Sequence, residues 1–406
     1  MLTRMPDRII LLVCAFLRAF ATGLMGVLLG LYLARLDFNA GEIGVVIGVG
    51  LSGAALSSLI VTFLGDTLGR RRSLLVLAVL ATAGGTALLW TTHLFTVCLA
   101  AFLGMVNGAG RDRAAALVLE QAVLPQTASD AGRTKAFAWY NVLQDAGHAL
   151  GSLAAGLPAL IGHGVGNGEL FGYQVAIGVY AALYAVTGML YLGLSSAIET
   201  STSGTRWIPP VSPESRRIIA RVAGLFAIDS FAGGFLGTAL LSYFFFVRFG
   251  VGEATIAVLF FAARIANGVS HLGAAWLAAR IGLVNTMVFT HIPSSVALIA
   301  VALVPQFWMA ALLFILRELL VEMDVPTRQS YVMAVVKPEE RTFASGVTSL
   351  VRLAGWAVGP FAAGALMQGV ALATPLIVGG AMKIGYDVLL YFSFRGVKPP
   401  EERQGD

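Results

Sequence analysis

Apolar stretches long enough to cross a lipid bilayer alternate with short polar loops along almost the whole chain. A helix needs about 20 apolar residues to span the hydrocarbon core. Twelve stretches of this kind can be marked off, at approximately residues 10–35, 43–65, 72–92, 95–118, 134–161, 173–194, 218–247, 254–278, 283–304, 307–332, 343–369 and 374–394. The one sizeable polar interval separates the sixth stretch from the seventh. The pattern predicts an all-α membrane protein with twelve transmembrane helices.

The two halves of the chain repeat one sequence pattern. In the first and seventh stretches, Phe20 and Gly23 recur as Phe231 and Gly234 at a shift of 211. In the fifth and eleventh stretches, a shift of 208 relates five small residues, Gly147, Gly151, Ala154, Ala155 and Gly156, to Gly355, Gly359, Ala362, Ala363 and Gly364. Small residues let helix backbones approach closely. The repeat predicts two pseudo-symmetric six-helix bundles, residues 1–194 and 218–406, joined by a cytoplasmic linker of residues 195–217.

Composition and charge support a membrane location. The chain is 57% hydrophobic and only 12% charged, a balance that would leave a soluble protein with exposed apolar surface. Seventeen lysines and arginines fall in loops on the side of the N-terminus, whereas only Arg35 and Arg248 fall in the opposite loops. The positive-inside rule therefore predicts that both termini are cytoplasmic. The first apolar run continues to about Leu36 without an A-x-A-type cleavage site, so we expect a retained helix.

The sequence lacks the motifs of several other function classes. It contains no G-x-x-x-x-G-K-[ST] phosphate loop, no G-x-S-x-G and no cluster of histidine and cysteine at metal-ligand spacing. The two cysteines, Cys14 and Cys98, both lie in apolar runs. The net charge of +5 comes from residues in interhelical loops, beside lipid headgroups. We therefore expect neither an enzyme nor a nucleic-acid-binding protein, and no cofactor or metal.

The loop after the second stretch carries a motif known from one transporter family. Residues 62–72 read TFLGDTLGRRR, which resembles the G-x-x-x-D-x-x-G-R-[RK] signature of the major facilitator superfamily, with Thr62 in place of the first glycine. In the eleventh stretch, residues 359–364 (GPFAAG) resemble the G-P-x-x-G-G element of that superfamily. The counterpart in the fifth stretch, residues 151–156 (GSLAAG), lacks the proline associated with antiporters. The whole pattern is similar to bacterial twelve-helix facilitator permeases of the efflux type.

The resemblance implies a gate at the cytoplasmic end of the second helix. Asp66 would accept hydrogen bonds from backbone N–H groups at a helix end and pair with an arginine. Gly69 would permit a tight turn, and Arg70 and Arg71 would reach lipid phosphate or neighbouring helix ends. The alternative is that the arginines, Arg72 among them, only fix the topology.

Charged residues inside apolar stretches are the main candidates for solute binding or proton coupling, because each is costly in lipid unless it is paired or hydrated. In the superfamily, helices 1 and 5 are neighbours, as are helices 7 and 11. We therefore predict two ion pairs with exchanged signs, Arg18–Asp145 and Asp229–Arg352. They would either take part in coupling or hold the helices in register.

Two further groups of charges lie in helices 4 and 10, which line the central cavity in superfamily members. Asp112 and Arg113 in helix 4, and Arg317 and Glu318 in helix 10, are candidates for solute or proton sites. The superfamily's usual helix 4 arginine is replaced by Gly104. Two other groups have the i, i+4 spacing of intrahelical pairs and are interpreted as structural, namely Asp324 with Arg328 and Lys383 with Asp387.

These features are compatible with three functions. The first is a proton-coupled exporter, an antiporter for a drug, metalloid or other toxic solute, which the similarity of residues 324–341 to resistance-linked permeases favours. The second is a proton-coupled importer of a polar or anionic metabolite, which the intramembrane arginines favour. The third is a membrane scaffold, against which the many intramembrane charges argue. We expect a monomeric secondary active transporter in the bacterial inner membrane, with protons as coupling ion, a small-molecule substrate and lipid as partners.

The orientation can be tested with a single cysteine in the linker. In a variant of the chain lacking Cys14 and Cys98, Ser203→Cys should react with a membrane-impermeant thiol reagent only after the cytoplasmic face is exposed, because the linker is predicted to be cytoplasmic. Labelling of intact cells would contradict the predicted topology.

Overall fold

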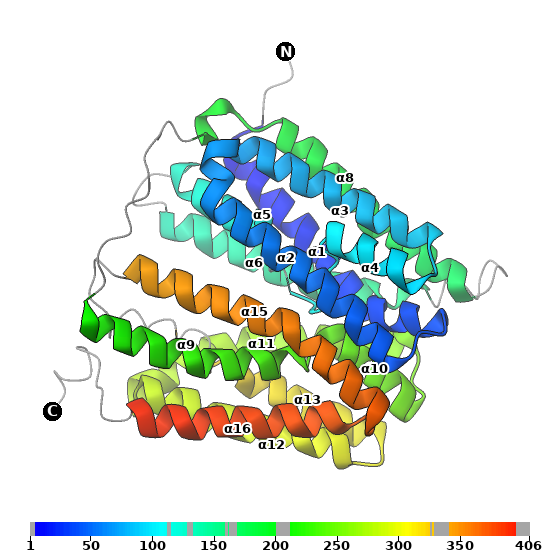
Figure 1. The fold of residues 1–406 in the computed structure, drawn as a ribbon, viewed down its shortest axis with the longest axis vertical. Coiled ribbons are helices and arrows are strands. Elements are labelled where there is room, and N and C mark those ends of the chain that lie inside the picture. The colour runs from blue at the N-terminus through cyan, green and yellow to red at the C-terminus, as the bar shows by residue number, and fades with distance from the viewer. Residues whose placement is uncertain are drawn as a thin grey trace. The chain divides into compact units, whose positions relative to one another are not determined.

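The structure, a computed structural model, describes residues 5–111, 115–127, 133–158, 161, 169–199, 212–324, 327–328 and 341–394. Within these ranges the chain forms helices connected by turns (Figure 1). It divides into two compact units. The first consists of Met1–Gly204 with Gly237–Phe261, and the second of Thr205–Leu236 with Ala262–Asp406. The predicted bundle boundaries at residues 194 and 218 stay a prediction.

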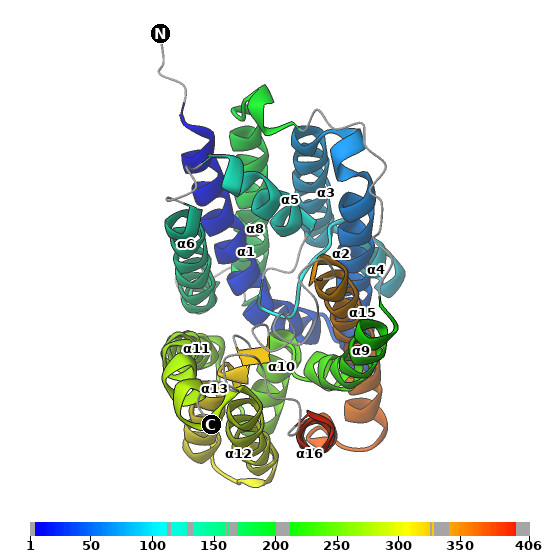
Figure 2. The same cartoon turned by 90° about the vertical axis from the view of Figure 1, so that its left-hand side faces the viewer.

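The first unit is organised around α1, which lies between α6 and α8 (Figure 2). Its apolar core gathers side chains from several helices, among them Leu11, Leu74 and Leu119. The helices of this unit are α1 (Asp7–Arg35), α2 (Ala40–Leu68), α3 (Arg70–Trp90), α4 (Leu94–Leu103), α5 (Ala115–Val123), α6 (Arg133–Ala154), α8 (Glu169–Leu192) and α10 (Thr238–Phe249), with short 3-10 turns at Leu124–Thr127 and Ser196–Ile198.

The second unit is organised around α9, which packs against α15 and α16, while α12 packs against α13 and α16. Its core includes Val222, Phe226, Met287 and Leu390. The helices are α9 (Pro213–Gly234), α12 (Leu283–Leu303), α13 (Phe307–Val321), α15 (Arg341–Gly369) and α16 (Thr374–Phe394). The long helix α11 (Glu253–Ile281) begins in the first unit and continues into the second.

The all-helical membrane fold predicted from the sequence is confirmed. Among the described residues, nine segments are long and apolar enough to cross a membrane, and Leu94–Leu103 adds a shorter apolar helix. Most of the predicted limits agree with the helix ends within a few residues, as for 374–394 and α16 (Thr374–Phe394). The predicted number of twelve transmembrane helices stays a prediction, since α6 is not among the nine segments.

The sequence repeat corresponds to the same backbone contact in both units. A Cβ placed on Gly151 of α6 would lie 2.0 Å from the carbonyl oxygen of Phe20 in α1. A Cβ on Gly359 of α15 would lie 2.6 Å from the carbonyl oxygen of Phe231 in α9. Gly151 and Gly359 are repeat equivalents, and so are Phe20 and Phe231. The prediction that equivalent helix faces approach neighbouring backbone closely is therefore confirmed.

The fourth predicted helix, residues 95–118, is wrong as a continuous element. It ends at Leu103, and the backbone is non-helical from Gly104 to Arg111 before α5 begins at Ala115. Met105 and Gly110 adopt positive φ angles of 51° and 72°. The Asn107 side chain replaces lost helical bonds, because its Oδ1 accepts from Ala109 N at 2.8 Å and its Nδ2 donates to Arg111 O at 2.5 Å.

The seventh predicted helix, residues 218–247, is also interrupted, between the end of α9 at Gly234 and the start of α10 at Thr238. The start of α10 binds residues 104–111, the non-helical segment between α4 and α5 that we call the unwound part of helix 4. The N–H of Ala239 donates to the carbonyl of Gly108 at 2.9 Å, and Oγ1 of Thr238 donates to the carbonyl of Ala109 at 3.0 Å. These bonds satisfy carbonyl groups that have no helical partner, and they explain why Gly237–Phe261 belongs to the first unit.

An ion pair holds the beginning of α11 in the same unit. Arg35 Nη2 at the end of α1 lies 3.0 Å from Glu253 Oε1, and the hydroxyl of Tyr173 in α8 donates to the same oxygen. The guanidinium of Arg35 also lies over the ring of Phe246 in α10, 5.0 Å from its centroid. Two helices from the first half of the sequence, α1 and α8, therefore share one polar contact with the start of α11 in the second half.

The glycine contact gives a matched pair of substitutions. Gly151→Ala should lower the free energy of unfolding of the detergent-solubilised protein by about 1–3 kcal/mol, and with it the melting temperature, because the new methyl group meets backbone that must move. Gly178→Ala in α8 is the control, since nothing lies within 4 Å of its Cβ position. It should be neutral or slightly stabilising. Equal melting temperatures for the two variants would contradict the assigned packing.

Candidate functional site

A buried polar network lies inside the first unit, where four helices each contribute one side chain. Arg18 of α1 and Glu120 of α5 form an ion pair, with 2% and 0% of their side chains exposed. The hydroxyl of Tyr191 in α8 donates to Glu120 Oε1 at 2.5 Å, and that of Tyr140 in α6 donates to Oε2 at 2.7 Å. Nη1 of Arg18 also donates to the Tyr191 hydroxyl at 2.8 Å. Both carboxylate oxygens therefore have partners, as a buried carboxylate requires.

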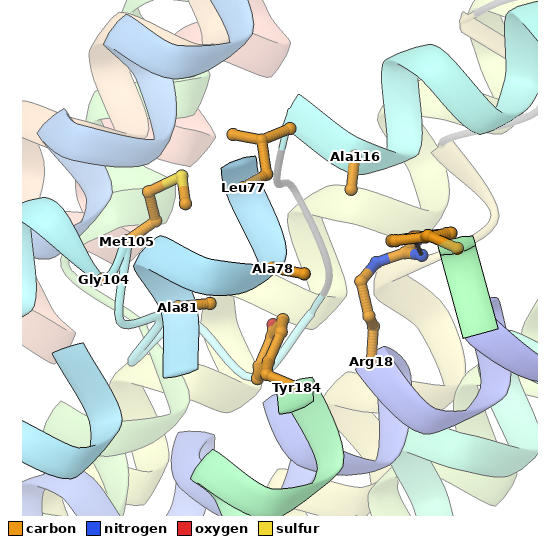
Figure 3. Close-up of a pocket in the computed structure, with 9 residues that line it drawn as sticks. Arg18, Leu77, Ala78, Ala81, Gly104, Met105, Ala116 and Tyr184 are labelled. Carbon is orange, nitrogen blue, oxygen red and sulfur yellow. Dashed lines mark hydrogen bonds between the residues drawn. The ribbon is translucent and has the colours of Figure 1, made fainter. Parts of the chain in front are cut away.

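A small pocket adjoins this network. Figure 3 shows Arg18 extending from α1 beside the pocket, with Tyr184 across from it and apolar side chains around it. Gly104 and Met105, the first residues of the unwound part of helix 4, form part of the wall, and the remaining lining residues are Leu77, Ala78, Ala81, Ala116, Tyr184 and Tyr191. The pocket thus combines one guanidinium with tyrosine rings and an apolar wall. Interrupted transmembrane helices are where transporter folds place solute and ion sites.

A second buried network lies in the second unit and is centred on Asp229 of α9. Lys383 Nζ of α16 lies 2.6 Å from Asp229 Oδ1, and Arg328 Nη1 lies 3.3 Å from Oδ2. Arg328 Nη1 also lies 2.5 Å from Asp324 Oδ2, which confirms that predicted i, i+4 pair. The guanidinium of Arg328 stacks over Phe226, 5.1 Å from the ring centroid.

The predicted pairs for the two centres have different outcomes. The predicted Asp229–Arg352 ion pair is wrong. Asp229 pairs with Lys383 and Arg328 instead, and Arg352 acts on Asp229 only electrostatically, at longer range. Lys383 reaches Asp229 because α16 packs directly on α9. The Arg18–Asp145 pair stays a prediction: the side chain of Asp145 is exposed on α6, and the partners shown for Arg18 are Glu120 and Tyr191.

The intrahelical Lys383–Asp387 pair is also wrong. Lys383 binds Asp229 of α9, and Asp387 contacts His291 of α12, so each residue has its partner on another helix. The other candidates are dispersed. Arg317 and Glu318 are buried neighbours in α13 that pair with each other, whereas Asp112 and Arg113 lie outside the described residues.

The predicted gate motif lies at the turn between α2 and α3. Gly69 has a φ of 89°, which favours glycine, and it separates the two helices. The carboxylate of Glu199 accepts from the backbone N–H groups of Arg70, at 2.7 Å, and Arg71, at 3.1 Å. The Asp66 side chain lies outside the described residues, so its predicted hydrogen bonds stay a prediction. The side chains of Arg70 and Arg71 donate to the carbonyls of Ile198 and Leu192, which ties this turn to the end of α8.

Several residues of these networks are not predicted from the sequence. Glu120, Tyr140 and Tyr191 are far from Arg18 in sequence, and only the packing of α5, α6 and α8 around α1 brings them together. A carboxylate inside an apolar stretch was the available signal for Glu120. His291 carried a similar signal, as a titratable side chain within an apolar helix.

The Arg18–Glu120 pair can be tested by a double-mutant cycle. Glu120→Gln and Arg18→Gln should each lower stability by about 3–5 kcal/mol, because each removes a partner of a buried charge. The double substitution should recover most of that loss. Tyr191→Phe is the control, because it removes two hydrogen bonds but no charge, at about 1 kcal/mol for each bond. Thermal unfolding of purified protein measures all four variants. Additive losses would show that the two residues do not interact.

Comparison with known proteins supports the architecture. The solved nucleoside transporter NupG has a TM-score of 0.71 at 17% identity, with 97% of this chain and 99% of NupG covered. A D-xylose–proton symporter gives a TM-score of 0.71 at 13% identity, with 95% and 96% covered. An auto-inhibited POT family peptide transporter gives 0.75 at 11% identity, with 96% and 97% covered. At these identities the similarity shows the fold.

Sequence comparison assigns the family. An uncharacterized membrane protein of Saccharomyces cerevisiae, YJR124C, is 22% identical over 421 residues, covering 96% of this chain and 94% of the yeast protein. The sequence profile of the Major Facilitator Superfamily matches residues 11–360. With its helical membrane fold, its repeated halves and its buried charges, the chain belongs to the major facilitator superfamily of membrane transporters.

Proposed function

We propose that this transporter couples the movement of a small anionic or polar solute to that of protons across the bacterial inner membrane, with both moving inward. The observation that carries the proposal is the Arg18–Glu120 ion pair at the edge of the pocket beside the unwound part of helix 4. The pocket offers a positive charge to an anionic group and an apolar wall to the remainder of a small solute.

The ion pair supplies a physical link between the two ligands. In the present arrangement the carboxylate of Glu120 occupies one side of the Arg18 guanidinium. A proton on Glu120 would remove its negative charge and weaken the ion pair, so that a solute carboxylate or phosphate could take its place on Arg18. Proton and solute would then bind together and cross together, which defines symport. The Tyr140 and Tyr191 hydroxyls would keep the carboxyl group in position in both states.

The fold allows such coupling, since a structure of the same fold is that of a D-xylose–proton symporter. Export in exchange for protons is the second candidate, and it is the function that the sequence by itself favours. It is carried by the similarity of residues 324–341 to resistance-linked permeases. In that case the solute would be neutral or cationic, would bind the Glu120 carboxylate and would be released when Glu120 takes up a proton.

Uptake experiments separate the two functions. In cells that express the protein, a panel of labelled carboxylates, phosphates, nucleosides and sugars should reveal a solute that accumulates at acidic external pH. A protonophore should abolish this accumulation, because the proton gradient drives it. If the protonophore instead raises the cellular level of the solute, the transporter is an exporter and the proposed direction is wrong.

Coupling itself is tested on Glu120. In proteoliposomes with an imposed pH gradient, Glu120→Gln should equilibrate the solute without concentrating it, since an amide cannot carry the proton. Asp37→Asn, at an exposed acidic residue after α1, is the control and should concentrate solute like the parent. Concentrative uptake by Glu120→Gln at the parent level would exclude Glu120 as the coupling group.

A further inference from the structure

A histidine and an aspartate form a buried pair in the second unit, outside the network described for solute binding. Nδ1 of His291 in α12 lies 2.9 Å from both carboxylate oxygens of Asp387 in α16, and 2% and 1% of the two side chains are exposed. The ring of Tyr386 packs edge-on against the imidazole, with centroids 6.1 Å apart. Histidine is the side chain whose ordinary titration falls in the physiological range. This pair is therefore suited to gain or lose a proton.

The pair is linked to Asp229 through one lysine. Lys383 lies four residues before Asp387 on α16, so the two side chains share one face of the helix and lie within reach of each other. In the structure, Lys383 Nζ binds Asp229 of α9, at 2.6 Å. Asp387 is left with His291. Lys383 is therefore within reach of two carboxylates, those of Asp229 and Asp387, and Asp387 has His291 as its partner.

We propose that the His291–Asp387 pair is a proton-binding site, and that its proton determines which of the two carboxylates holds Lys383. The inference rests on the proposed proton coupling and assigns a second group that takes part in it. A proton from water enters the pair and adds one positive charge to it. The same proton leaves to water in the other state, so that no other reactant is needed.

The two states differ in how the charge of Asp387 is balanced. With the proton bound, an imidazolium neutralises Asp387, and Lys383 is available to Asp229, which is the arrangement in the structure. Without it, Asp387 is a buried carboxylate beside a neutral ring, a costly arrangement. Lys383 then moves to Asp387, four residues along the same helix. Asp229 keeps Arg328 alone, and its changed charge balance transmits the protonation state from α12 and α16 to α9.

Among the described residues, the neighbouring elements contribute further charges to this part of the second unit, besides Lys383 of α16. The helix α9 contributes Asp229, the segment after α13 contributes Asp324 and Arg328, and α15 contributes Arg352. The helix α13 itself carries Arg317 and Glu318, which pair with each other. Asp324 and Arg328 also bind each other, so their charges largely cancel. The proton on the His291–Asp387 pair is therefore the variable charge of this group.

The site can be tested without knowing the solute, by measuring the melting temperature of purified protein between about pH 5.5 and 8. A group that binds protons differently in the folded and unfolded states makes stability depend on pH. His291→Gln and Asp387→Asn should each remove part of the pH-dependent change in melting temperature seen in the parent. His93→Gln, at an exposed histidine before α4, is the control and should keep the parent profile.

A purely structural pair would behave differently, since its loss would lower the melting temperature equally at every pH. That result, or a parent-like pH profile for His291→Gln, would overturn the proposal. If a single variant fails to fold, the double substitution of His291→Gln with Asp387→Asn removes both partners and should fold with the same part of the pH dependence removed. A double variant that keeps the parent's pH dependence would equally overturn it.

The role of Lys383 gives a directional test. Asp229→Asn removes the competing carboxylate, so Lys383 should stay on Asp387 and weaken proton binding by the pair. The pH-dependent transition in melting temperature should then shift to lower pH, and an unchanged or raised transition would exclude the exchange of Lys383. These measurements need no solute. They can therefore fail while proton-driven uptake through Glu120 succeeds, or succeed while that uptake fails.

Discussion

Close contact between helix backbones at glycine positions sets the geometry on which the rest of each unit depends. In the first unit α6 meets α1 where Gly151 faces the carbonyl of Phe20, and in the second α15 meets α9 where Gly359 faces that of Phe231. A side chain at either glycine would separate the helices. Because lipid provides little hydrophobic driving force between helices, such close packing is a main source of their association. It also fixes the rotation of α1 and α9, and with it the direction of Arg18 and Asp229.

Each of these two helices then carries a charge that must be neutralised inside the bundle. Arg18 is met by Glu120, whose two oxygens also accept from tyrosine hydroxyls, and Asp229 is met by Lys383 and Arg328. Removing one partner of such a group strongly destabilises the fold, because it leaves a buried charge without compensation. A proton or a charged solute that enters the group can therefore change its arrangement with a large effect, which is what coupled transport requires.

The break in helix 4 gives the first unit its pocket. Glycines and Asn107 allow the backbone to leave the helix at Gly104, and the start of α10 accommodates the freed carbonyls of Gly108 and Ala109. Exposed backbone polar groups at membrane depth are tolerated only where protein or water satisfies them. The unwound segment is thus held by a helix from the other half of the sequence, and it places Gly104 and Met105 beside Arg18.

The sequence by itself determined the helical membrane fold, the repeated halves and the glycine faces, because apolar length and recurring small residues act locally along the chain. It also located Arg18 and Asp229 as costly intramembrane charges. Their partners were decided only by tertiary packing. Glu120, Lys383 and the His291–Asp387 pair come from helices distant in sequence, and the rule of i, i+4 spacing misassigned Lys383 because a carboxylate on another helix was closer to its ammonium group. A charged side chain inside the membrane pairs with the opposite charge that the fold places nearest to it. The distance between two helices cannot be calculated from the spacing of residues along the sequence.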